Sequence, residues 1–282
     1  MTELPHLGER TLIMGVLNVT PDSFSDGGLH ASTDAAIDAG RRMIADGADI
    51  LDIGGESTRP ATFQDNQPLD PAEEAARVIP VIQRLRNEFP TVAISIDTYK
   101  AEVASAALDA GATIVNDISG LTFDPSMASL VADRGCPIVL MHILGRPRDI
   151  PSKPDYADVV QSIIEFLATQ VAFARASGVD VSRIIVDPGI GFGKTAEHNL
   201  EILRRLREIV NLGYPVLVGA SRKRFIGKIL GIDDPRDRVE GTAATVALSI
   251  AAGASIVRVH DVKEMARVAR VSDAVVRSWS EG

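Results

Sequence analysis

The segment 186–195 places an acid and three glycines directly after a short apolar run. A carboxylate on the last residue of a strand, here Asp187, would be held in place by its sheet. The glycines would let the backbone bend sharply and approach a flat ligand closely. The segment therefore predicts a binding site at the end of a strand.

Polar residues end the other short apolar runs of the chain in the same way. They are Asn18, Gly54-Gly55-Glu56-Ser57, Asp97, Asn116-Asp117, His142, Ser221-Arg222-Lys223, and Arg258 with His260. Because parallel barrels carry their active sites at the carboxyl ends of their strands, we expect these ends to converge on one site.

The elements that would position these residues are strands that alternate with amphipathic helices. The strands are predicted at 11–17, 50–53, 93–96, 114–115, 137–141, 184–186, 215–218 and 255–259. Continuously apolar runs rich in Val and Ile are typical of parallel strands buried on both faces. The helices are predicted at 33–46, 71–89, 100–110, 125–134, 156–177, 196–211, 222–230 and 261–279, with an additional helix at 238–252.

Eight such alternations predict an α/β fold, a single-domain (β/α)8 TIM barrel over residues 1–282, with a core at about 11–279 and an extra helix before the last strand. The length of 282 residues suits one domain of this kind. An open doubly wound sheet is the main alternative. Polar residues at nearly every strand end favour the closed barrel.

Composition narrows the possible partners. The formal net charge of −9 argues against nucleic acid, whose phosphates require clustered Lys and Arg. Cys136 is the only cysteine, which fits a buried thiol in a reducing compartment. Residues 1–10 lack the pattern of a secretory signal, and no apolar segment is expected to approach the roughly 18 residues of a membrane span. We therefore expect a cytoplasmic protein without a membrane partner.

The chain resembles the dihydropteroate synthases, folate-pathway enzymes built on a pterin-binding TIM barrel. The resemblance covers about residues 11–260 and rests on an ordered set of motifs at 14–28, 52–60, 95–98, 115–120, 141–142, 187–195, 221–223 and 258–260. It implies the condensation of 6-hydroxymethyl-7,8-dihydropterin diphosphate with 4-aminobenzoate, giving 7,8-dihydropteroate and pyrophosphate with the assistance of Mg²⁺.

A pterin ring presents an edge of hydrogen-bond donors and acceptors, which Asp97, Asn116 and Asp187 could satisfy. The resemblance assigns these three residues to the pterin. It also places Lys223 on the ring and the guanidinium of Arg258 over its face, at strand ends where barrels commonly bind anions. We expect apolar walls from Met141, Ile118 and Phe192, positions that are more often simply core.

The leaving diphosphate requires groups that stabilise negative charge. The candidates are Asn18, Thr58, Arg258 and His260, and Asn18 would offer its oxygen to Mg²⁺. A structural role for His260 remains open. For His142, contact with the ligand and simple packing are equally compatible with the sequence.

The aminobenzoate half of the predicted site draws on two loops and on the seventh strand end. Its candidates are Phe24, Ser57, Thr58, Arg59, Pro60, Lys223 and Arg224. Asp26 would stabilise a cationic pterin methylene, with a plain turn aspartate as the alternative. Ala61 and Arg224 stand where many relatives carry Gly and a small hydroxyl residue. Sulfonamides, which resemble aminobenzoate, would be expected to compete.

Two other functions are compatible with parts of the pattern. A methyltransferase that moves a methyl group from a reduced folate to a corrinoid would account for the three pterin residues, but not for the motifs at 57–60 and 221–223. A noncatalytic pterin-binding paralogue would bind ligand without turnover. The resemblance also implies a homodimer that acts on small-molecule substrates.

Overall fold

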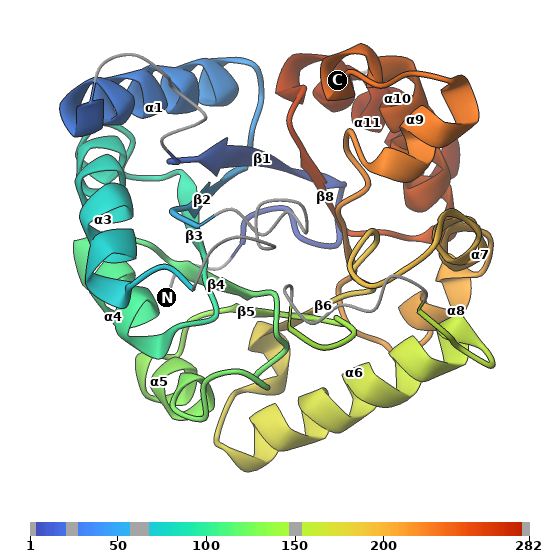
Figure 1. The fold of residues 1–282 in the computed structure, drawn as a ribbon, viewed down its shortest axis with the longest axis horizontal. Coiled ribbons are helices and arrows are strands. Elements are labelled where there is room, and N and C mark those ends of the chain that lie inside the picture. The colour runs from blue at the N-terminus through green and yellow to red at the C-terminus, as the bar shows by residue number, and fades with distance from the viewer. Residues whose placement is uncertain (1–3, 21–27, 57–67, 147–153, 278–282) are drawn as a thin grey trace.

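A computed structural model of the protein describes residues 4–20, 28–56, 68–146 and 154–277. Eight short strands form its centre (Figure 1). They are β1 (Leu12–Asn18), β2 (Ile50–Gly54), β3 (Ala93–Asp97), β4 (Ile114–Asp117), β5 (Ile138–Met141), β6 (Ile184–Asp187), β7 (Leu217–Val218) and β8 (Ile256–Val259).

The strands close into a parallel barrel. Their order is β6-β5-β4-β3-β2-β1-β8-β7, so β1 pairs with both β2 and β8. A bridge between Val186 and Val216 joins the two ends of this sheet, and Val186 N donates to Pro215 O at 2.9 Å. This closure confirms the predicted (β/α)8 barrel and rules out the open doubly wound sheet.

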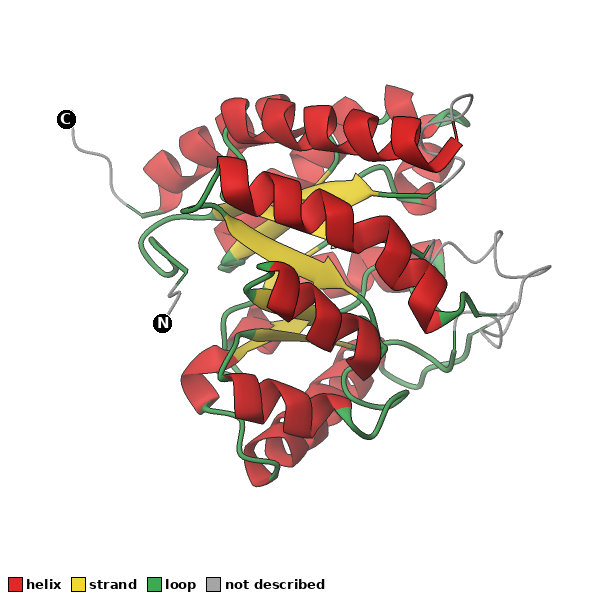
Figure 2. Cartoon of the chain, turned by 90° about the vertical axis from the view of Figure 1, so that its left-hand side faces the viewer, coloured by secondary structure: helices red, strands yellow, loops and turns green. Residues whose placement is uncertain are grey.

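Helices surround the strands (Figures 1 and 2). They are α1 (Gly28–Ala45), α3 (Pro71–Glu88), α4 (Ala101–Ala110), α5 (Met127–Arg134), α6 (Val159–Ala176), α7 (Ala196–Arg204), α8 (Leu206–Val210), α9 (Arg224–Leu230), α10 (Val239–Ala252) and α11 (Val262–Val276). The predicted additional helix is present as α10. Short 3₁₀ turns occur at Val181–Arg183 and Pro235–Asp237.

The predicted helix at 196–211 is wrong in one respect, because it consists of two helices. Arg205 ends α7 and begins α8 with φ −107° and ψ 17°, outside the helical region. Its guanidinium bonds both Glu208 and Asp158, and Asp158 caps the start of α6. The helix at 222–230 also begins later than predicted, because Arg222 has a φ of 58°.

Two apolar layers account for most of the core. The larger layer lies between strands and helices. The smaller one fills the barrel interior with residues from all eight strands: Leu12, Met14, Ile50, Ala93, Ile114, Val139, Ile185, Leu217 and Ile256. Because side chains alternate across a strand, the residues two positions further along also face the interior. This alternation determines which residues form the site.

Helix α6 corrects one expectation from the sequence. By length and composition α6 could cross a membrane, because its mean hydropathy is 1.2 over 18 residues. The prediction that no apolar segment approaches this length is therefore wrong. In the fold, Val160, Ile163 and Leu167 of α6 are fully buried in the layer between strands and helices. Packing on the barrel accounts for this apolar face.

Candidate active site

The inward positions change from apolar to polar toward the carboxyl ends of the strands. Two residues beyond the apolar interior layer lie Asp52, Ser95, Asn116, Met141, Asp187 and Arg258. Two residues further on lie Asn18, Asp97, Ile118, Ser221 and His260. The predicted strand-end residues therefore gather at one end of the barrel because they share the inward phase of the alternation.

Arg258 lies at the centre of this group and bridges two carboxylates. Its Nε donates to Asp52 Oδ2 at 2.5 Å, and its Nη2 donates to Asp97 Oδ2 at 2.6 Å. Burial lowers the pKa of Arg258, but the charges of Asp52 and Asp97 more than offset this effect and raise it. The guanidinium is therefore a permanent cation whose plane is fixed by two strands.

Asp97 presents one carboxylate oxygen without a partner. Its Oδ1 is buried and has no hydrogen bond within the described part of the chain, while Oδ2 is occupied by Arg258. Burial raises the pKa of Asp97 to about 7, and Arg258 opposes this rise. A buried acceptor of this kind is costly unless a ligand donor reaches it.

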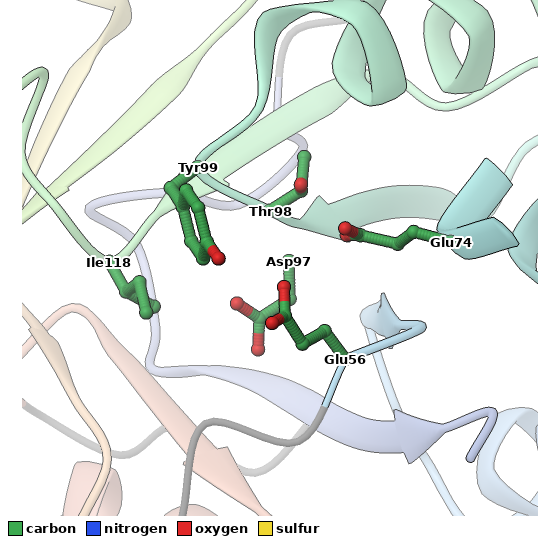
Figure 3. Close-up of a pocket in the computed structure, with 6 residues that line it drawn as sticks. All are labelled: Glu56, Glu74, Asp97, Thr98, Tyr99 and Ile118. Carbon is green, nitrogen blue, oxygen red and sulfur yellow. The ribbon is translucent and has the colours of Figure 1, made fainter. Parts of the chain in front are cut away.

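A small pocket opens beside Asp97. Figure 3 shows the carboxyl groups of Asp97 and Glu56 close to one another, with the hydroxyl of Tyr99 on one side and the carboxyl group of Glu74 on the other. Thr98 and Ile118 complete the lining. The lining therefore combines hydrogen-bond acceptors with the apolar side chain of Ile118.

Asn116 and Asp187 add two further polar groups. Asn116 Nδ2 donates to Asp52 Oδ2 at 3.1 Å, which holds the amide across the barrel. Asp187 Oδ1 accepts from Gly189 N at 2.7 Å, which fixes the carboxylate at the end of β6. Burial raises the pKa of Asp187 to about 6, and the hydrogen bond from Gly189 opposes this.

An apolar wall lies beside these polar groups. Tyr99, Ile118, Met141 and Ile143 form a buried cluster against which Phe192 packs, so the three predicted wall residues do come together. The ammonium of Lys223 lies 4.2 Å from the centre of the Phe192 ring. Glycine is favoured at Gly191 because its φ is +84°, a conformation that other residues rarely adopt.

His260 is fixed by Ser221 from the neighbouring strand. Ser221 Oγ accepts from the backbone N–H of His260 at 3.2 Å and lies 3.0 Å from its Nδ1. These two contacts fix the ring of His260 just after the end of β8. Asn18 ends β1 opposite Gly54 of β2 and is half-buried.

Several predicted residues cannot be placed. Asp26, Phe24, Ser57, Thr58, Arg59, Pro60 and Ala61 lie outside the described residues. Arg224 is exposed as the first residue of α9. The described part of the site therefore covers the pterin and diphosphate candidates more fully than the aminobenzoate candidates.

Sequence reasoning missed Asp52 as a member of the site. It lies two residues after Ile50 on an inward position and is completely buried, so a strict count of the strand alternation would have found it. His142 packs against other side chains of the fold. Its ring lies edge-on to Phe166 at 5.0 Å, and its Nδ1 lies 2.9 Å from Lys194 Nζ.

A buried ion cluster was also missed. Lys100 Nζ donates to Glu56 at 2.7 Å, to Glu74 at 2.5 Å and to the backbone oxygen of Leu69 at 2.6 Å. These partners come from three separate stretches of chain, so their convergence depends on the tertiary fold. Cys136, by contrast, is buried as predicted, and burial raises the pKa of its thiol to about 11.

The carboxyl end of this closed parallel barrel carries fixed hydrogen-bond acceptors, a bridging guanidinium and an apolar wall. This combination is typical of a barrel enzyme that binds a flat polar heterocycle. The sequence profile of the pterin binding enzymes matches residues 14–260, and the chain belongs to this family.

Within the family, the chain is similar to dihydropteroate synthases. It is 52% identical to the enzyme of Synechocystis over 270 residues, which cover 96% of this chain and 92% of the relative. The dihydropteroate synthase of Xanthomonas albilineans, solved with 4-aminobenzoic acid, superposes with a TM-score of 0.88 at 44% identity and covers 95% of this chain and 93% of its own. A structure of that enzyme in complex with 7,8-dihydropteroate gives 0.85 at 41% identity, with coverages of 97% and 95%.

Proposed function

We infer that the protein is a transferase that condenses 6-hydroxymethyl-7,8-dihydropterin diphosphate with 4-aminobenzoate to form 7,8-dihydropteroate and pyrophosphate. The observation that carries this function is the buried Oδ1 of Asp97, which has no partner among the described residues and lies beside an apolar wall in a member of the pterin-binding family. Complexes of the Xanthomonas albilineans relative with 4-aminobenzoic acid and 7,8-dihydropteroate support the same substrates here.

Three strand-end residues bind the pterin edge in this proposal. Asp97 Oδ1 and the second oxygen of Asp187 accept from ring N–H groups, and the amide oxygen of Asn116 adds a third acceptor. Met141, Ile118 and Phe192 contact the faces of the ring. Lys223, held over Phe192, lies on the side from which aminobenzoate approaches.

The leaving diphosphate occupies the mouth of the barrel, close to Arg258 and His260. The carbon–oxygen bond breaks, and the diphosphate departs with the electron pair. The amine nitrogen then forms the new bond to the pterin methylene and releases one proton. Fixed cationic and N–H groups accelerate such a step because they stabilise the charge that develops on the leaving oxygen.

Mg²⁺ fits this arrangement as an ion carried by the substrate. The described residues contain no group of three His, Cys, Asp or Glu side chains that could hold a metal. Mg²⁺ keeps several waters and binds substrate phosphates, so a single protein oxygen is sufficient. Asn18, at the end of β1, would supply this oxygen, and Thr58 is a further candidate for the diphosphate.

The aminobenzoate half of the proposal rests on the residues predicted from the sequence. Phe24, Ser57, Thr58, Arg59 and Pro60 would enclose the aromatic amine. Asp26 would face the cationic methylene, and Arg224 or a backbone N–H would contact the carboxylate. We also propose a homodimer and a cytoplasmic location, which follow from the resemblance and from the single buried cysteine.

The function is tested by offering two substrate pairs to the purified protein. We expect dihydropteroate from dihydropterin diphosphate and 4-aminobenzoate with Mg²⁺. We expect no methyl transfer from methyltetrahydrofolate to a corrinoid. Methyl transfer without dihydropteroate would establish the methyltransferase instead, and ligand binding without either product would indicate the noncatalytic paralogue.

A further inference from the structure

Lys194 lies outside the predicted site, yet its ammonium group joins the ends of β5 and β6. Nζ lies 2.8 Å from Gly189 O and 3.0 Å from Phe192 O, both in the loop after β6. It also lies 2.9 Å from Nδ1 and 3.3 Å from the backbone oxygen of His142, which follows β5. Because an ammonium carries three protons and accepts none, these contacts use its full donor capacity.

The ring of His142 acts as an acceptor in this arrangement. Burial lowers the pKa of His142 to about 3, and the charge of Lys194 lowers it further, so the imidazole is neutral. Lys194 donates to Nδ1, which places the ring proton on Nε2. His142 therefore serves as a fixed partner of Lys194.

The two strand ends approach so closely that their carbonyl groups crowd together. A Cβ on Gly189, which has φ +66°, would lie 1.9 Å from His142 O. A Cβ on Gly193, with φ +63°, would lie 2.6 Å from Leu144 Cβ. Carbonyl oxygens that point into one small volume repel one another, and a cation between them removes this repulsion.

The residues that Lys194 fixes are those that line the proposed pterin site. Gly189 donates to Asp187 Oδ1 at 2.7 Å, and Phe192 carries the ring under Lys223. Met141 directly precedes His142 on β5 and belongs to the apolar wall. A shift of the loop after β6 would therefore move an acceptor and one wall of the site together.

We propose that Lys194 is a positioning residue for the pterin, which ties the ends of β5 and β6 together so that Asp187, Phe192 and Met141 form one rigid surface. This inference rests on the proposed function and assigns a role to a residue that contacts neither substrate.

The charge of Lys194 gives the proposal a second measurable consequence. The charged and titratable groups around it are His142, Asp187 and Lys223. Lys194 lowers the pKa of Asp187 and so opposes the rise that burial causes. Burial lowers the pKa of Lys194 itself to about 7, and Asp187 opposes this. A neutral residue at position 194 would therefore let Asp187 gain its proton at a higher pH.

The test compares pteroic acid binding by the whole protein and by its variants, measured by titration calorimetry across pH. We expect Lys194→Met to weaken binding at least about tenfold and to move the acidic loss of affinity to higher pH. The KM for 4-aminobenzoate should change less than the KM for the dihydropterin diphosphate. Lys228→Met, the same change at an exposed lysine of α9, should bind as the wild type does.

A second variant keeps the test decisive if Lys194→Met does not fold. Lys194→Gln retains two N–H donors but removes the charge, so we expect weaker binding than in the wild type and the same upward shift in pH. Wild-type affinity and pH dependence in a folded Met or Gln variant would overturn the proposal. Because pteroic acid binding requires no turnover, this failure is distinct from an absence of dihydropteroate synthesis by the wild type.

Discussion

Arg258 and Asp97 form a buried ion pair in which only one oxygen of the carboxylate is used. Arg258 Nη2 donates to Oδ2 at 2.6 Å, and Oδ1 has no partner among the described residues. The guanidinium also bonds Asp52, so Asp97 cannot rotate freely without disturbing β2, β3 and β8. The pair therefore holds one acceptor toward the pocket.

Asp97→Asn tests this acceptor directly. We expect the variant to bind pteroic acid about 10- to 100-fold more weakly, because an amide places an N–H group either toward Arg258 or toward the ring donors. Titration calorimetry at pH 8 measures the change, and circular dichroism verifies the fold. Unchanged affinity in a folded variant would remove Asp97 from the pterin site.

The pH dependence of pterin affinity follows from the two acids. Burial raises the pKa of Asp97 to about 7 and that of Asp187 to about 6. The ionised forms accept from the ring, so affinity should fall as pH drops from about 8 through 7 and then 6. KM for the dihydropterin diphosphate, measured between about pH 5 and 8.5, reports this loss.

The same raised pKa values determine how the stability of the fold depends on pH. Because the folded state holds these two protons more tightly than the unfolded chain does, each acid contributes most to stability below its unfolded pKa. This contribution is lost as pH rises through the folded pKa values of about 6 and about 7. As pH rises, pterin affinity should therefore increase while this contribution to stability decreases.

Asp97→Asn should remove the upper step, near pH 7, from the pH profile of pterin affinity. An unaltered profile would contradict the assignment of this step to Asp97.

His260→Ala should separate turnover from pterin binding. His260 is held by Ser221 just after β8, on the side of the barrel where the proposed diphosphate site lies. We expect kcat to fall on the order of 10- to 100-fold while pteroic acid binding is retained, since pteroic acid lacks a diphosphate. An equal loss of both quantities would indicate a structural histidine.

Asp117 should be needed for stability through the backbone it caps. It is fully buried and accepts from Ser119 N and Leu121 N, each at 2.8 Å, where Leu121 has φ 71°. Asp117→Ala leaves two buried donors unpaired and should lower the free energy of unfolding by about 2–4 kcal/mol. Urea denaturation measures this loss. A midpoint equal to that of the wild type would contradict the role.

A sulfonamide should compete with 4-aminobenzoate because the two share an aromatic amine opposite an anionic or polar group. We expect it to raise the apparent KM for 4-aminobenzoate and to leave kcat unchanged. Initial rates over a grid of both compounds measure the effect. Inhibition that persists at saturating 4-aminobenzoate would place the drug elsewhere.

The barrel could be predicted because most strands are short apolar runs that end in a polar residue. Strands β5 and β6 follow this pattern closely, since IVLM precedes His142 and IIV precedes Asp187. The split at Arg205 escaped prediction, because its cause is a set of ion pairs with Asp158 and Glu208 that the local sequence does not reveal.

Site residues could be predicted where the alternation of side chains along a strand places them. They could not be predicted where contacts between distant parts of the chain place them. Asn116 and Asp187 follow from their strand ends. Lys194 did not, because its partners include His142, which follows β5 and lies 52 residues away in the sequence. The bond between Arg258 and Asp52 likewise depends on the strand pairing that places β8 beside β1. The sequence therefore indicates the candidate site residues, and the folded barrel determines which of them form hydrogen bonds with one another.

The most direct test of the function measures pyrophosphate and dihydropteroate in the same reaction, with dihydropterin diphosphate, Mg²⁺ and 4-aminobenzoate. The proposed condensation predicts that the two products appear in equal amounts and that both depend on 4-aminobenzoate. Pyrophosphate release without dihydropteroate when both substrates are present, or the absence of both products from a folded protein that binds pteroic acid, would contradict it.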